Sequence, residues 1–219
     1  MRMRKKKNLN ERVFACSDLL ICKLFNLGEP LTAGLIDFPA VFGNSNPVRL
    51  EIGCGKGGFV NEMAKIHPRV NFIAVEKSEN VIISALEQTL SEKLTNVRYI
   101  IGMAEYLDLI IPPRSVEQIY LNFSCPFPKV RYAKHRLTHR GFLEIYKKIL
   151  IEKGQVSFKT DNVSFFEFSL ESLSANGFRL QNVLYDLHNS ELTGNIITEY
   201  ESLFIQKGLK INYLEAIWK

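Results

Sequence analysis

Two patterns of hydrophobic residues recur along most of the chain. Short apolar runs bounded by turn residues are typical of buried strands, and stretches with apolar residues three and four positions apart are typical of helices. The pattern predicts strands over residues 49–52, 71–75, 97–101, 116–121, 155–159, 178–187 and 209–218. It predicts helices over residues 59–66, 80–94, 138–150 and 163–174. We expect Ser78 or Asn80 to cap the second helix and Asn176-Gly177 to end the fourth.

The alternation of these strands and helices predicts an α/β fold. Repeated strand–helix units form a mostly parallel sheet with helices on both faces, because their crossovers are right-handed. We therefore expect a Rossmann-like domain with a seven-stranded, mostly parallel sheet over residues 41–219. Residues 1–40 mix basic side chains, a short apolar stretch and turn formers, which predicts a basic, partly flexible N-terminal arm. Ligands of such sheets bind beyond the carboxyl ends of the strands, so the residues that follow each strand are the candidate site.

Basic residues gather in two places. The net charge is +5, and the basic side chains of residues 2–7 alone supply it. A second cluster contains no acidic residue and comprises Lys129, Arg131, Lys134, Arg136 and Arg140. Two basic patches on an otherwise neutral chain predict a polyanionic partner such as a nucleic acid. A solvated tail and a charged helix start are the alternative interpretation.

The four cysteines are scattered and form no CxxC pair. This spacing predicts neither a metal site nor a disulfide framework, and it is typical of the reducing cytoplasm. The basic start is not followed by the apolar segment of a secretory signal. No apolar stretch approaches the roughly 20 residues of a membrane span, so we expect a cytoplasmic protein without a membrane partner.

A glycine turn suggests a cofactor. The run Gly53-Cys54-Gly55-Lys56-Gly57-Gly58 follows the first predicted strand and opens the first predicted helix, a context that indicates a nucleotide-like cofactor. Glu51 lies two residues before the turn. A carboxylate there repels the pyrophosphate of NAD but attracts the sulfonium and ammonium groups of S-adenosylmethionine, which favours the latter. Glu76 ends the next strand and can accept hydrogen bonds from the ribose of either cofactor.

Four motifs, in order along the chain, carry a family resemblance. They are Val41-Phe42-Gly43-Asn44 through Gly57; Leu121-Asn122-Phe123-Ser124-Cys125-Pro126-Phe127-Pro128-Lys129; Phe158-Lys159-Thr160-Asp161-Asn162; and Leu187-His188-Asn189-Ser190 with Ile197-Thr198-Glu199-Tyr200-Glu201. With these motifs the chain resembles the bacterial tRNA (guanine-N7)-methyltransferases over nearly its whole length. The resemblance implies the class I methyltransferase fold, S-adenosylmethionine as the cofactor, and methylation of N7 of the variable-loop guanine of tRNA.

The glycine turn and the resemblance together define the candidate site. The residues expected to bind the cofactor are Glu51, Gly53, Gly55, Gly57, Glu76, Met103 and Asn122. The resemblance implies that the guanine is bound by Lys129, Asp161, Thr198, Glu199, Tyr200 and Glu201. Phosphate contacts position RNA without reading its sequence, and we expect them from Arg131, Lys134, Arg136 and Arg140.

Three positions depart from the family pattern. Cys125 stands where the family usually has Asp, and Phe127 replaces the usual Trp. Met103 stands where an Asp or Asn usually contacts the adenine, and Glu105, two residues on, is the possible substitute.

The chemistry of N7 tolerates the change at Cys125. Guanine N7 carries a lone pair and no proton, so its methylation requires alignment with the methyl group rather than a general base. A nearby carboxylate would stabilise the cationic purine that forms, and a thiol supplies little of this. We expect Asp161, with Glu201, to supply the negative field and the chain to be a working but slower enzyme. A covalent role for Cys125 is disfavoured because N7 methylation needs no adduct.

Three other functions remain open from the sequence. A methyltransferase with another substrate is disfavoured by the basic cluster and by the motif at residues 198–201. A catalytically weak or silent tRNA-binding protein is supported by Cys125 and Met103. An NAD-dependent oxidoreductase is disfavoured by Glu51. Monomer and homodimer are both compatible with the sequence.

Overall fold

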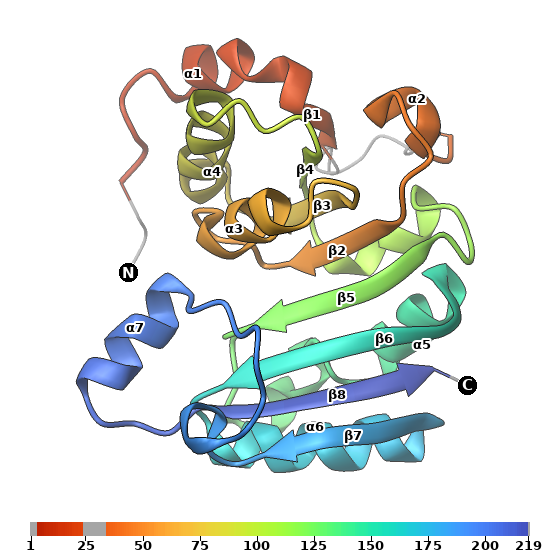
Figure 1. Cartoon of the computed structure of the whole chain (residues 1–219), viewed down its shortest axis with the longest axis vertical. Helices are drawn as coiled ribbons and strands as arrows, with labels where there is room; N and C mark the ends of the chain where they lie inside the picture. Colours follow the sequence, from red (N-terminus) through yellow and green to blue (C-terminus); the bar gives the residue numbers. More distant parts are fainter. Residues whose placement is uncertain (1–3, 24–33, 219) are drawn as a thin grey trace. The chain divides into compact units, whose positions relative to one another are not determined.

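The computed structural model describes residues 4–23 and 34–218, and the chain divides into two compact units, residues 1–110 and 111–219 (Figure 1). Each unit has its own strands and its own buried side chains. Within the described ranges, no helix combines the length and the apolar content that crossing a membrane requires.

The N-terminal unit contains a parallel sheet. Its strands lie in the order β1-β4-β3-β2, with β1 at Leu20–Lys23, β2 at Val48–Ile52, β3 at Asn71–Glu76 and β4 at Val97–Ile101. Helices α3 (Gly58–Ile66) and α4 (Glu79–Ser91) pack on β3 and β4. Both strands at the centre of this sheet bury most of their side chains, and β3 is an almost continuous apolar run, whereas β2 also carries Arg49 and Glu51.

Shorter elements complete this unit. They are α1 (Leu9–Ala15), the 3-10 helix η1 (Ser17–Leu19), α2 (Phe38–Phe42) and η2 (Ala104–Leu109). The expected N-terminal arm thus contains α1 and β1, and α1 packs against α4. Two bonds from the Asn80 side chain hold the preceding segment: its Oδ1 accepts from the Lys6 backbone amide at 2.6 Å, and its Nδ2 donates to the Arg4 carbonyl at 2.9 Å.

The C-terminal unit contains a mixed sheet. Its strands lie in the order β5-β6-β8-β7, with β5 at Val116–Asn122, β6 at Leu150–Thr160, β7 at Phe178–Leu184 and β8 at Asn212–Trp218. β5 and β6 are parallel, whereas β8 is antiparallel to both β6 and β7. The arrowheads of β5 and β6 point toward α7 (Glu199–Gln206) in Figure 1, while α6 (Val163–Ala175) covers β6, β7 and β8. The other helices are η3 (Val130–His135), α5 (Arg140–Ile149) and η4 (Leu187–Asn189).

Most expected elements are confirmed, with some corrections. The described residues contain eight strands rather than seven, because β1 pairs with β4 in parallel. The helix expected over 80–94 runs from Glu79 to Ser91, and no side chain caps it: Ser78 makes no capping bond and Asn80 binds the arm. Asn176 ends α6, and Gly177 follows with a φ of +86°, as expected. The arm residues 1–3 and 24–33 lie outside the described residues.

Candidate active site

The glycine turn of the N-terminal unit has the left-handed backbone that only glycine adopts freely. The φ angles of Gly53, Gly55 and Gly57 are +82°, +59° and +86°. The turn is fixed to the end of the neighbouring strand, because the amides of Gly53 and Cys54 donate to the Val75 carbonyl at 2.8 and 3.0 Å. The sequence therefore places a tight, anchored turn directly after β2.

Two of these glycines face open space and the third does not. A Cβ built on Gly53 or Gly55 would meet no atom within 4 Å. A Cβ built on Gly57 would lie 2.6 Å from the Ala85 Cβ of α4. Gly57 thus lets α3 and α4 approach each other, whereas the backbone at Gly53 and Gly55 is accessible to a ligand.

Two carboxylates make the surroundings of the turn negative. Glu51 lies on β2 with 3% of its surface exposed, and Glu76 ends β3, where its Oε1 accepts from the Ser78 amide at 2.9 Å. The pKa of the buried Cys54 thiol is raised well above its usual range, first by burial and then by the charges of Glu51 and Glu76. A field that disfavours a thiolate also disfavours a phosphate, and it favours a cation. The turn and its acids therefore fit S-adenosylmethionine.

The end of β4 lies beside Glu76. The Gly102 amide donates to the Glu76 carbonyl at 3.0 Å, and Met103 follows directly. Met103 directly precedes η2, which begins with the buried Ala104 and the exposed Glu105. The first unit thus brings together the glycines, both acids and Met103 at the carboxyl ends of β2, β3 and β4.

In the C-terminal unit, the loop after β5 has an unusual backbone. Phe123 and Phe127 have φ angles of +51° and +41°, which are uncommon for side chains of this size. Cys125 lies between them and is exposed. The Phe123 amide donates to the Lys159 carbonyl at 2.9 Å, which ties the start of the loop to β6. Sterically disfavoured conformations persist where the surroundings hold them, and they cluster at functional sites.

The basic cluster divides into two kinds of residue. Arg136 is partly buried and binds backbone carbonyls of the loop that carries Cys125. The exposed members are Lys129, Arg131, Lys134 and Arg140. The sequence did not distinguish Arg136 from the others.

A buried network surrounds Glu201, which has no exposed surface. Its Oε2 accepts from Lys159 Nζ at 3.2 Å and from the Thr198 amide at 3.3 Å. Its Oε1 accepts from Asn195 Nδ2 at 2.6 Å and lies 3.2 Å from His188 Nε2. Thr198 Oγ1 accepts from the Glu201 amide at 3.0 Å, which completes a capping box at the start of α7. The Glu201 carboxylate therefore has partners within its own unit.

The remaining candidates lie at the end of β6 and on α7. Asp161 is exposed at the end of β6 and lines a cavity of about 340 Å³. Tyr200 is 60% exposed, and its ring lies 6.5 Å from that of Phe123, which also stacks on Phe204 at 5.6 Å. Glu199 begins α7, but its side chain lies outside the described part of the chain. α7 is thus joined to the loop after β5 through aromatic rings.

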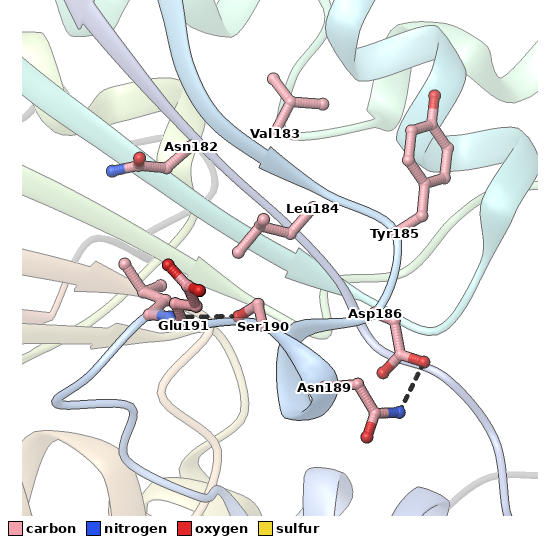
Figure 2. Close-up of a pocket in the computed structure, with 9 residues that line it drawn as sticks. Asn182, Val183, Leu184, Tyr185, Asp186, Asn189, Ser190 and Glu191 are labelled. Atoms are coloured by element: carbon pink, nitrogen blue, oxygen red, sulfur yellow. Dashed lines mark hydrogen bonds between the residues drawn. The ribbon is translucent and has the colours of Figure 1, made fainter.

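A larger cavity of about 650 Å³ lies elsewhere in the same unit. Figure 2 shows its lining by the end of β7 (Asn182–Leu184), by Tyr185 and Asp186 directly after it, and by residues 189–192, with Asn189 donating to Asp186 at 2.9 Å. No residue of the candidate site lines it. Sequence reasoning missed this cavity, and it also missed Lys159 and Asn195. The signal for Lys159 was a lysine at the end of a predicted strand, where a buried charge is rare unless it is paired.

Solved methyltransferases share this fold at low sequence identity. One match is the 16S rRNA methyltransferase KamB, with a TM-score of 0.60 and 15% identity over 84% of this chain and 94% of that chain. Another is an S-adenosylmethionine-dependent methyltransferase from Aquifex aeolicus, with a TM-score of 0.57 and 13% identity over 98% and 100% of the two chains.

The fold and the acid-flanked glycine turn define a class I methyltransferase. A family model described as "Putative methyltransferase" matches residues 45–214. The tRNA (guanine-N(7)-)-methyltransferase of Geobacillus thermodenitrificans is 49% identical over 81% of this chain and 82% of its own, and that of Macrococcus caseolyticus is 45% identical over 80% and 83%. The chain belongs to the tRNA (guanine-N7)-methyltransferase family.

Proposed function

We propose that the protein transfers the methyl group of S-adenosylmethionine to N7 of a guanine in the variable loop of tRNA. The observation that carries this proposal is the open glycine turn in the negative field of Glu51 and Glu76. The names of the relatives support the substrate and the position of the methyl group. A tRNA substrate also favours the cytoplasm as the place of action.

The N-terminal unit supplies most of the cofactor contacts in this proposal. When bound, S-adenosylmethionine supplies an electrophilic methyl group on a positively charged sulfur. Glu51 favours that charge, and Glu76 accepts hydrogen bonds from the ribose hydroxyls. The backbone at Gly53 and Gly55 permits close approach, while Gly57 keeps α3 against α4. Met103, which follows β4, completes the proposed set in this unit, and Asn122 at the end of β5 stays a prediction from the sequence.

Asp161 is the carboxylate that we assign to reading the base. Its exposed side chain can accept hydrogen bonds from guanine N1–H and N2–H₂, which adenine does not offer in this pattern. Glu201 already accepts four contacts, so we assign it and Thr198 to holding the start of α7. Tyr200, at this helix start, is exposed and can face the base or its neighbour.

This reaction does not require a catalytic group at Cys125. N7 needs no proton transfer, so alignment and exclusion of water are sufficient for reaction. A carboxylate at this position would add electrostatic stabilisation of about 2–4 kcal/mol. Cys125→Asp is therefore expected to preserve or raise kcat. Loss of activity in this variant would indicate a specific role of the thiol and contradict the mechanism.

The exposed basic residues bind the tRNA backbone in this proposal. No acidic residue lies within this cluster, so each exposed cation can neutralise a phosphate; these cations are Lys129, Arg131, Lys134 and Arg140. Because bound cations are released from the RNA, log(kcat/KM) should fall linearly with log[salt].

The decisive experiment is incubation with labelled S-adenosylmethionine and unmodified tRNA, followed by nucleoside analysis. We expect 7-methylguanosine, and Asp161→Asn should remove most of it while the exposed control Glu171→Gln retains it. Calorimetry of Glu51→Gln should give weaker cofactor binding than the control Glu62→Gln on the surface of α3. A chain that binds tRNA but neither binds the cofactor nor forms 7-methylguanosine would be a silent binding module instead.

A further inference from the structure

Arg136 joins three parts of the C-terminal unit. Its Nε donates to the Pro126 carbonyl at 2.9 Å, and its Nη2 donates to the Phe127 carbonyl at 3.2 Å. The same guanidinium lies over two rings of α6, 4.4 Å from the centre of Phe168 and 5.8 Å from that of Phe165. Arg136 therefore ties the loop after β5 to α6.

The helix beneath this guanidinium is itself firmly attached. Thr138 Oγ1 and Ser169 Oγ share a buried hydrogen bond of 2.8 Å, and Ser172 Oγ donates to the Thr138 carbonyl at 2.6 Å. Ser169 Oγ also donates to the Phe165 carbonyl at 2.7 Å. The rings that support Arg136 thus belong to a helix bonded to the segment that directly follows Arg136, which makes the assembly rigid.

The loop needs such a support. Phe127 adopts a φ of +41°, which costs free energy unless the surroundings hold it, and its carbonyl is one of the two that Arg136 binds. Two carbonyls at consecutive residues match the planar fork of a guanidinium, and a flat cation stacks on aromatic rings. Lysine offers neither the fork nor the flat face, so this position is specific for arginine.

The contrast with the rest of the basic cluster assigns Arg136 a different task. Arg131 and Lys134 are exposed and can meet phosphates, with the Arg131 guanidinium also lying over the Tyr132 ring at 4.8 Å. Arg136 is instead partly buried, with its donors directed at the loop. We propose that Arg136 is a positioning residue that fixes the backbone of Cys125–Phe127 for methyl transfer, and that it is not a phosphate contact. This proposal rests on the proposed function.

The test compares Arg136→Lys and Arg136→Ala with Arg131→Ala and Lys134→Ala, measuring kcat and KM for tRNA over a range of salt concentrations. Arg136→Lys keeps the charge but loses the fork, so kcat should fall about 10- to 100-fold, as expected for a misplaced site, while KM and the salt slope stay unchanged. Arg131→Ala and Lys134→Ala should raise KM and each reduce the salt slope by about 1. Unchanged kcat in Arg136→Lys, or a reduced salt slope in Arg136→Ala, would overturn the proposal.

A second measurement does not depend on activity. Hydrogen exchange of the peptide covering residues 122–129 should be faster in Arg136→Lys than in the wild type and unchanged in Lys134→Ala. Phe168→Leu keeps both hydrogen bonds of Arg136 but removes one supporting ring, so its exchange rate should lie between those of the wild type and Arg136→Lys. This variant replaces Arg136→Lys in the test if Arg136→Lys does not fold. If the wild type fails to form 7-methylguanosine, the proposed function fails, yet exchange still decides whether Arg136 holds the loop. Equal exchange in all variants would refute that role.

Discussion

Replacement of Lys159 by methionine should destabilise the C-terminal unit strongly. Lys159 lies on β6, between β5 and β8, and is 5% exposed, while its partner Glu201 is fully buried. Lys159→Met keeps the length and volume of the side chain but removes the cation. Breaking a buried ion pair by removing one partner costs about 3–5 kcal/mol, because the other charge is left without compensation.

The remaining donors set where in this range the cost should fall. Asn195 Nδ2 and the Thr198 amide still donate to Glu201, and His188 Nε2 lies 3.2 Å from its Oε1. We therefore expect a loss of about 3 kcal/mol, at the lower end of the range. Since domains of this size are stable by about 5–15 kcal/mol, the variant should still fold.

Urea unfolding followed by the fluorescence of Trp218 is the appropriate assay. Trp218 is the single tryptophan of the sequence and packs on Phe178, 5.4 Å between ring centres, so it reports on the C-terminal unit. If α7 detaches instead, the fluorescence transition stays in place and hydrogen exchange of residues 199–206 accelerates. A shifted unfolding transition and faster exchange of α7 would both result from loss of the Lys159–Glu201 ion pair.

The double variant Lys159→Met/Glu201→Gln is the matched control. It removes both charges, so it should recover a large part of the stability lost in the single variant, as coupled sites do. A loss below about 1 kcal/mol in Lys159→Met, together with unchanged exchange of α7, would refute the reasoning, because a surface pair has that magnitude.

Three further predictions concern other contacts. Gly57→Ala should lower the free energy of unfolding by about 2–5 kcal/mol, since it combines left-handed strain with a steric clash, whereas Gly55→Ala should cost about 1–2 kcal/mol; urea titration compares them. The bidentate hydrogen bond from Arg12 lowers the pKa of Glu87, so the attachment of α1 is complete above the usual carboxyl pKa and is lost as the pH falls through the lowered value. Hydrogen exchange of α1 should show this dependence, weakly because the pair is partly exposed, and Glu87→Gln should abolish it. A thiol reagent at pH 8 should modify one cysteine quickly, and Cys125→Ser should remove that fast phase; a fast phase that persists would show that another thiol is accessible.

The main elements of both units could be predicted because each has its own apolar pattern and end signals within a short stretch of sequence. Strands such as β3 are continuous apolar runs, and α6 ends at an Asn-Gly pair. β1 and α7 could not be predicted in this way. β1 is four residues long within a segment of mixed composition, and its pairing with β4 is distant in sequence. α7 is short, and its start is fixed by Glu201, whose partners come from several segments.

The candidate site was predictable where topology alone brings residues together. The carboxyl ends of parallel strands meet, so the glycine turn, Glu76 and Met103 were expected as neighbours. The partners of individual charges were not predictable. Arg136 looked like one of several cations, but the carbonyls and rings that bind it are known only from the fold.

The way the N-terminal segment meets Asn80 has a consequence for its tolerance to mutation. The amide side chain of Asn80 acts as a peptide group would in a ladder, because it bonds an amide and a carbonyl of the main chain. Recognition of this kind does not depend on which side chain stands at Arg4 or Lys6, so substitutions at either position leave both Asn80 bonds in place. At position 6 a substitution removes only the separate bond from Lys6 Nζ to Ser84 Oγ at 2.6 Å. Proline at position 6 is the exception, because it has no backbone N–H to donate to Asn80 Oδ1.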